Sequence, residues 1–237
     1  MLFVHETHRV MGKHEDAFED AYRGHWLTAL ARTDDARLLY FMRLAHGTGR
    51  AYNMITVTAV TDGRAWEALA RRMQRGDLRK WAARVDKMRY DVTSKVLVPA
   101  EWSPLQEVEL ANVPTDGGQH DLTLFMEDTA WPHAGRLEEY LAAARDNYAP
   151  SLTEGRHGGR SLLELQAVFT PAWGTGPRRR EVILWQRVTK PAGIAALVTS
   201  EVPAEHRAPG TWMHDALTVR GDWESRLLHT ASWSPLS

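Results

Sequence analysis

The stretch Ala100-Glu101-Trp102-Ser103-Pro104-Leu105 recurs near the end of the chain as Ala231-Ser232-Trp233-Ser234-Pro235-Leu236, an offset of 131 residues (231 minus 100). The same offset relates six further pairs without a gap: Trp81 and Trp212, Arg89 and Arg220, Asp91 and Asp222, Ser94 and Ser225, Lys95 and Arg226, Leu97 and Leu228. Chance does not readily align so many uncommon residues. The sequence therefore predicts two copies of one unit in tandem.

Earlier parts of the two copies match at smaller offsets. Gly47-Thr48-Gly49 recurs as Gly174-Thr175-Gly176, each between two strand-like runs where glycine suits a hairpin turn. Two helices show the same apolar spacing at an offset of 119, with Phe18, Ala21, Tyr22, His25 and Ala29 in the first and Leu137, Tyr140, Leu141, Ala144 and Tyr148 in the second. The growing offset indicates small insertions in loops of the second copy.

Each copy is expected to read strand, helix, strand, strand, helix, strand. The expected strands are 2–10, 37–46, 51–60 and 91–98, then 121–129, 161–170, 180–189 and 224–232; the expected helices are 14–31 and 64–88 (broken near Gly76), then 134–148, 191–200 and 209–219. This order is that of a ferredoxin-like unit. The predicted domains are residues 1–105 and 121–237, joined by a linker over 106–120 that contains Pro114, Gly117 and Gly118.

The doubled order of elements resembles the dimeric α+β barrel superfamily, in particular NIPSNAP-type proteins and fused relatives of antibiotic-biosynthesis monooxygenases. The resemblance implies an α+β fold in which two tandem ferredoxin-like repeats bury their sheets against each other as a pseudo-dimeric α+β barrel. It implies a range of activities: cofactor-free oxygenases, isomerases and cyclases, with haem bound in the chlorite dismutase-like group. Fold alone does not choose among them.

Composition excludes several classes of function. The 29 basic and 30 acidic residues give a net charge of -1, so a basic nucleic-acid-binding face is not expected. The absence of cysteine excludes disulfides, thiolate metal sites and a cysteine nucleophile. With no signal peptide and no apolar membrane span in the sequence, we expect a cytoplasmic protein whose partner is a small molecule, with homo-oligomers possible through sheet edges.

Catalytic candidates are polar residues on faces expected to be buried. His25 lies on the apolar face of the first helix beside Tyr22, and Ala144 occupies its place in the second copy. A histidine there could act as a general base, with Tyr22 binding substrate. The alternative is a histidine bonded to a carbonyl at the edge of the core.

The strand pair 161–170 and 180–189 carries a second set of candidates. Glu164 is a possible acid or base if it faces the interior, and Gln166, Trp185 and Gln186 are possible substrate-binding residues. The alternative for Glu164 is a solvated strand face or a cross-strand pair with Arg187.

Strands of the first copy and the last strand add three more candidates. Arg43 could hold an anionic oxygen, with Tyr40 as a neighbouring substrate-binding residue, although a surface arginine is the alternative. His229 on the last strand is a further substrate-binding candidate.

No metal site is expected, because His5 and His8 point to opposite faces of a strand. The sequence thus favours a cofactor-free oxygenase, isomerase or cyclase of specialised metabolism that acts on an apolar or aromatic small molecule. The alternatives are a haem protein of the chlorite dismutase type, with His206 or His214 as iron ligand, and a non-catalytic binding or scaffold protein.

Overall fold

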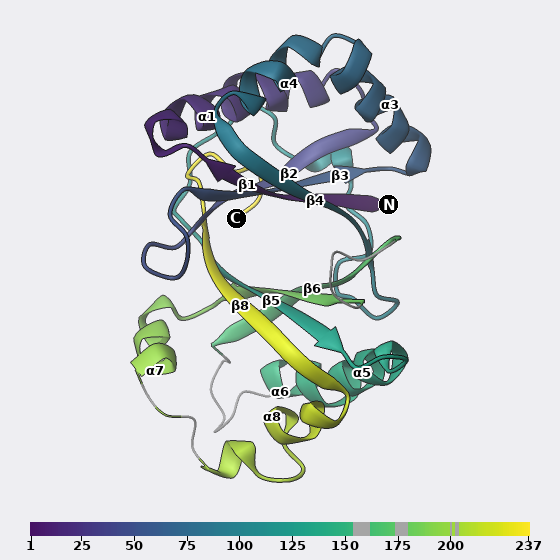
Figure 1. Cartoon of the computed structure of the whole chain (residues 1–237), viewed down its shortest axis with the longest axis vertical. Helices are drawn as coiled ribbons and strands as arrows, with labels where there is room; N and C mark the ends of the chain where they lie inside the picture. Colours follow the sequence, from purple (N-terminus) through teal and green to yellow (C-terminus); the bar gives the residue numbers. More distant parts are fainter. Residues whose placement is uncertain (154–161, 174–179, 200, 202–203) are drawn as a thin grey trace. The chain divides into compact units, whose positions relative to one another are not determined.

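The structure is a computed structural model that describes residues 1–153, 162–173, 180–199, 201 and 204–237 (Figure 1). The chain divides into two compact units. Unit 1 comprises Met1–Val98, Glu107–Thr123 and Leu227–Ser237, and unit 2 comprises Pro99–Gln106 and Leu124–Arg226. The predicted domains, residues 1–105 and 121–237, are defined by the sequence repeat, whereas these units are defined by their compactness. The predicted boundaries therefore stay a prediction.

Unit 1 is a ferredoxin-like α+β unit. Its elements are β1 (Leu2–Val10), α1 (Glu15–Ala21), a π-helical turn (Tyr22–Trp26), α2 (Leu27–Leu30), β2 (Ala36–Leu44), β3 (Asn53–Val60), α3 (Gly63–Arg75), α4 (Arg79–Asp86) and β4 (Arg89–Pro99). The antiparallel strands lie in the order β4-β1-β3-β2, and α1, α3 and α4 cover one face (Figure 1). Aliphatic and aromatic residues of these helices and strands form one buried core.

Unit 2 repeats this order. Its elements are β5 (Leu124–Pro132), α5 (Leu137–Ala143), a π-helical turn (Ala144–Tyr148), α6 (Ala149–Thr153), β6 (Leu163–Pro171), β7 (Val182–Val188), α7 (Ile194–Thr199), α8 (Trp212–Asp215) and β8 (Arg220–Thr230), of which the part from Leu227 onward belongs to unit 1. The strand order is β8-β5-β7-β6, with α5, α6 and α8 on one face of the sheet (Figure 1). The predicted fold class, two tandem ferredoxin-like units, is therefore confirmed.

Equivalent positions in the two units follow from the matching bounds of their elements. β1, α1 and the first π turn begin 122 residues before β5, α5 and the second π turn, for example at Tyr22 and Ala144. β4 and β8 begin 131 residues apart, at Arg89 and Arg220. The first helices thus align at 122 rather than at the expected 119, so Asn147, not Ala144, stands at the place of His25.

The segments that carry the repeated Trp-Ser-Pro sequence pack in matching ways. In unit 2, the backbone N–H of Ala100 donates to the carbonyl of Val168 at 2.8 Å, and the N–H of Val168 donates to Oγ of Ser103. In unit 1, Ala231 donates to the carbonyl of Phe41 at 2.9 Å, and Phe41 donates to Oγ of Ser234. The segment that begins at Ala100 is thus bonded to β6 and belongs to unit 2, and the segment that begins at Ala231 is bonded to β2 and belongs to unit 1.

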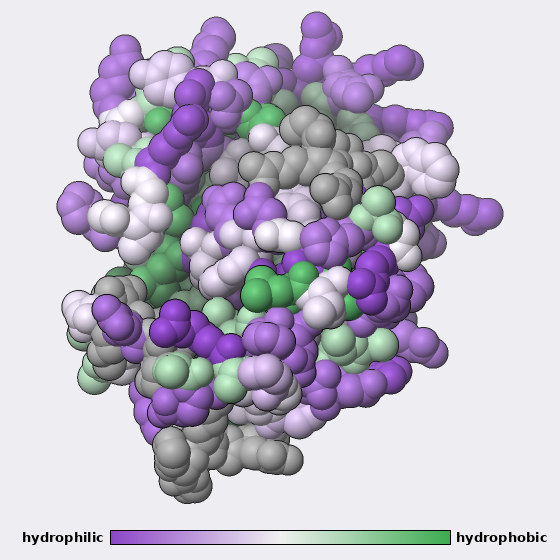
Figure 2. Space-filling model, turned by 60° about the horizontal axis from the view of Figure 1, so that its bottom comes forward, coloured by the Kyte–Doolittle hydropathy of each residue, from purple (hydrophilic) through white to green (hydrophobic). Residues whose placement is uncertain are grey.

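A face of the molecule seen in Figure 2 is mostly hydrophilic, with hydrophobic residues in small separate areas. None of the helices in the described parts of the chain is long and apolar enough to cross a membrane.

Candidate active site

A carboxyl and an imidazole lie side by side on the helix-covered face of β1. Glu6 and His8 are two residues apart on the strand, so their side chains leave the same face. Across from Glu6 on β3 lies Thr56, whose hydroxyl donates to Oε2 of Glu6 at 3.4 Å. Nε2 of His8 lies 3.1 Å from the same hydroxyl, so Thr56 connects the imidazole to the carboxyl.

Arg89 at the start of β4 fixes the tautomer of His8. Its guanidinium nitrogen lies 2.7 Å from Nδ1 of His8. Because arginine only donates hydrogen bonds, Nδ1 must accept, and the proton of the neutral imidazole is on Nε2. Nε2–H then donates toward the Thr56 hydroxyl, which leaves the proton of that hydroxyl for Glu6. The result is a directed chain from Arg89 through His8 and Thr56 to Glu6.

The π-helical turn after α1 brings Tyr22 into this cluster. The phenol oxygen lies 3.3 Å from Nε2 of His8, so Nε2–H points between two hydroxyl oxygens. Phe18 from α1 packs on the imidazole with ring centres 5.1 Å apart. Phe41 and Trp81 contact the Tyr22 ring at 5.5 and 5.3 Å. The polar chain is therefore embedded in aromatic side chains.

Burial shifts the proton affinities of this chain. Loss of solvent raises the pKa of Glu6 above its ordinary 4.5, although Arg89 and the Thr56 hydroxyl act in the opposite direction. Burial, together with the charge of Arg89, lowers the pKa of His8 well below 6.5, so the imidazole is neutral at pH 7. The side chain of Glu6 keeps 19% of its exposure, whereas that of His8 has none. Glu6 is thus the more exposed group of this pair.

Among the predicted site residues, Tyr22 is in this cluster and His25 is not. The expected inward orientation of His25 is wrong, because the π turn adds a residue and rotates the helix face so that Trp26 is buried instead. His25 is exposed and stacks on Trp81 with ring centres 6.3 Å apart.

Glu164 and Arg43 are both held in ion pairs. Glu164 is half exposed and accepts from the Arg187 guanidinium at 2.6 Å, so it does not face the interior, and the cross-strand pair is what forms. The Arg43 guanidinium is occupied by Glu15 and Glu19 of α1. Arg43 therefore has two carboxylates as partners already and is not an open anion site.

The other candidates lie in different surroundings. Gln186 is fully buried in unit 2, where its Oε1 accepts from the hydroxyl of Tyr148 and its amide nitrogen donates to Oδ2 of Asp128 at 3.0 Å. Trp185 is buried beside Phe125, and Gln166 sits at an irregularity in β6. Tyr40 is half-buried on β2 in unit 1, where His229 of β8 is paired in register with Arg43.

The sequence reasoning missed Glu6, His8, Thr56 and Arg89. The available signal was the spacing of Glu6 and His8, which places both on the strand face that also carries Val10, a core residue. A glutamate and a histidine on a strand face that packs in the core indicate a buried polar cluster, because a purely structural face would carry apolar residues.

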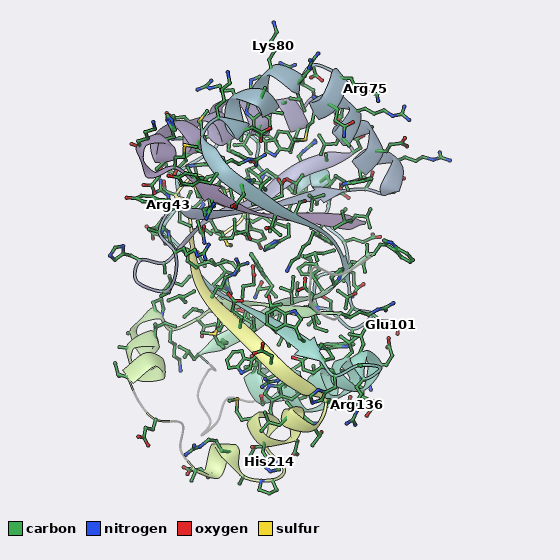
Figure 3. The ribbon with its side chains drawn as sticks, viewed as in Figure 1. Arg43, Arg75, Lys80, Glu101, Arg136 and His214 are labelled. Atoms are coloured by element: carbon green, nitrogen blue, oxygen red, sulfur yellow. The ribbon has the colours of Figure 1, made fainter. Side chains whose placement is uncertain are left out.

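His214, one of the two histidines predicted as possible haem ligands, is not placed to bind iron within unit 2. His214 is exposed, bonds to Asp215 at 2.8 Å and points outward from α8 in Figure 3. The side chain of His206 lies outside what the structure describes. Within the described parts of the chain, no three histidine or acidic residues are placed to hold a metal ion.

Comparisons with solved structures support the fold. The chain is similar to an anthrone oxidase-like protein (TM-score 0.59, 8% identity, 97% of this chain and 91% of that one) and to a candidate monooxygenase of Lactobacillus acidophilus (TM-score 0.57, 9% identity, 99% and 97%). A NIPSNAP domain protein of Burkholderia xenovorans aligns with 43% of this chain and 97% of its own at a TM-score of 0.37 and 20% identity.

Chlorite dismutases align only at TM-scores of 0.48 and 0.49, which is too low to argue for haem. No family model and no curated protein sequence matches the chain. The chain thus shares its α+β fold of two ferredoxin-like units with these solved structures.

Proposed function

We propose that this protein is a cofactor-independent enzyme that removes a proton from an apolar or aromatic small molecule, with Glu6 of unit 1 as general base. The observation that carries the proposal is the directed chain from Arg89 through His8 and Thr56 to a carboxyl whose pKa is raised. A carboxylate with a raised pKa is a stronger base, which suits it to work near neutral pH.

In the proposed step, Glu6 takes a proton from a carbon that is next to a carbonyl or conjugated with one through an aromatic ring, and the electron pair stays on the substrate as an enolate. The Thr56 hydroxyl orients the carboxylate, and His8 and Arg89 orient Thr56. These three are positioning residues. The aromatic side chains that surround this series of hydrogen bonds, among them Phe18 and Tyr22, favour an apolar reactant.

An oxygenase is the first choice among reactions that begin this way. Two structures that align over nearly the whole chain are a candidate monooxygenase and an anthrone oxidase-like protein, and both support this choice. With dioxygen as co-reactant, an anthrone enolate would give anthraquinone and water. An isomerase or cyclase would use the same first step without consuming oxygen.

Anthrone is a suitable probe, since it is a ketone with acidic C–H bonds. We expect the purified protein to accelerate oxygen uptake and anthraquinone formation, and Glu6→Gln to lower kcat/KM by about 10²–10⁴-fold. Glu164→Gln is the matched control, because Glu164 is exposed and paired with Arg187. His25→Ala should also retain full turnover. Equal rates in wild-type protein and Glu6→Gln would remove Glu6 from the reaction.

A further inference from the structure

Unit 2 has a buried polar cluster at the place that the candidate active site occupies in unit 1. Asp128 stands where Glu6 is, 122 residues on, and Arg220 stands where Arg89 is, 131 residues on. The carboxyl and the guanidinium are thus kept. The two groups that bind Arg89 are not kept.

In unit 1, Arg89 is bonded on two sides. It donates to Nδ1 of His8 and pairs with Asp86. In unit 2, the positions of these two partners hold Ala130 and Leu217. Neither side chain can accept a hydrogen bond, so Arg220 lacks the two acceptors that Arg89 has in unit 1.

Arg220 is consequently a buried cation without a bonding partner. Only 4% of the residue is exposed, yet its guanidinium makes no hydrogen bond or ion pair with any residue in the described parts of the chain. The guanidinium lies over the face of the Trp223 ring, 5.4 Å from its centre. Burial lowers the pKa of Arg220, and the nearby Asp128 and Asp222 offset this only in part. A buried guanidinium is costly unless an acceptor meets it.

Asp128 has an unused atom at the same place. The residue is 8% exposed and its Oδ2 accepts from Gln186, whereas its Oδ1 has no hydrogen-bond partner among the residues that the structure describes. The side chain of Ser225 is also close enough to lower the pKa of this carboxyl. Burial raises the pKa of Asp128. A carboxyl that keeps its proton can share it with a second carboxylate, as closely placed carboxyl pairs do.

We infer that unit 2 contains a binding site for a small organic carboxylate, held by the guanidinium of Arg220 and by Oδ1 of Asp128. The planar fork of arginine matches the two oxygens of a carboxylate. The methyl group of Ala130 stands where unit 1 has the histidine ring, so the side chain at this position is smaller and offers no competing hydrogen bond. This site differs in chemistry from the one in unit 1, since it has no imidazole, and it does not depend on the proposed reaction.

Aromatic residues line the same region of unit 2. Tyr148 bonds to Gln186 and packs on Trp212 with ring centres 5.1 Å apart, and Tyr140 packs on Trp212 at 5.7 Å. An aromatic or apolar group attached to the carboxylate would suit this lining, so benzoate is expected to bind more tightly than formate or acetate.

The test is thermal unfolding and isothermal titration with formate, acetate and benzoate, against equal concentrations of benzyl alcohol and sodium chloride. We expect benzoate to raise Tm in proportion to the logarithm of its concentration, and the two controls to have no such effect. Arg220→Met should abolish the shift while leaving the Tm of the free protein unchanged or higher, because it removes an uncompensated buried charge. Arg220→Lys should weaken binding at least tenfold, since the fork is lost.

Arg136→Met is the matched control, being the same change at an exposed arginine of unit 2 that pairs with Glu139. It should leave benzoate binding intact. Binding of none of the three carboxylates to the wild-type protein would overturn the inference, and so would equal binding by Arg220→Met or, should that variant not fold, by Arg220→Lys.

Discussion

The guanidinium of Arg89 donates to Nδ1 of His8 across 2.7 Å, and this contact sets the direction of the hydrogen bonds that lead from His8 through Thr56 to Glu6. A neutral imidazole that accepts at Nδ1 must donate at Nε2. The Thr56 hydroxyl is therefore free to donate to Glu6. A histidine in this setting orients other groups and is not itself the base.

His8 makes the stability of the protein depend on pH. Its pKa is well below 6.5 in the folded protein, whereas an unfolded chain takes the proton near 6.5. Stability is thus fully present above pH 6.5 and is lost as the pH falls below it, by about 1.4 kcal/mol per pH unit for one such group. Urea unfolding between pH 5 and 7 should show a flatter dependence for His8→Gln, while His25→Gln, at an exposed position, should keep the wild-type slope.

The Thr56 hydroxyl stabilises the ionised form of Glu6, so its removal should change a pH profile and not only a rate. Thr56→Val is expected to move the acidic limb of kcat/KM against pH to higher pH, since the hydrogen bond that lowers the pKa of Glu6 is lost. The rate at neutral pH should fall on the order of tenfold. Thr56→Ser should restore both. An unmoved acidic limb in Thr56→Val would mean that Thr56 has only a packing role.

Trp102 and Trp233 stand at equivalent places in the repeat, so comparing them measures how much one hydrogen bond adds to the free energy of unfolding. The indole N–H of Trp233 donates to Oε1 of Glu19 at 2.6 Å, whereas that of Trp102 is buried and has no acceptor within the described part of the chain. Trp233→Phe should therefore destabilise more than Trp102→Phe, with about 1.5–3 kcal/mol of the difference due to the bond to a charged group. Equal losses in chemical denaturation would show that this bond adds nothing net.

Much of the fold could be predicted from the sequence. The recurrence of Trp102 as Trp233 indicates two similar units, and the alternation of apolar and polar residues indicates strands, because both patterns follow from how side chains pack in the core. The break near Gly76 also separates α3 from α4 as expected. The π turn at Tyr22–Trp26 could not be predicted, since helical periodicity assumes 3.6 residues per turn throughout.

The candidate site was harder to predict for the same reason. The single added residue of the π turn exchanges His25 for Trp26 on the buried face. Arg89 and Thr56 come from strands far from Glu6 in sequence and meet it only through pairing registers. Tyr22 and Gln186 are buried as expected, because both stand on faces that the apolar pattern predicts to be buried, whereas their predicted role in substrate binding stays a prediction.

The most direct test of proton removal by Glu6 is hydrogen–deuterium exchange of anthrone in D2O without oxygen, followed by NMR, which isolates the first step from any later chemistry. Wild-type protein and Glu164→Gln are expected to accelerate the exchange of the CH2 hydrogens of anthrone to the same extent. Glu6→Gln is expected to lose about 10²–10⁴-fold of that acceleration. Exchange no faster than in buffer, or an equal rate for Glu6→Gln, would contradict proton removal by Glu6.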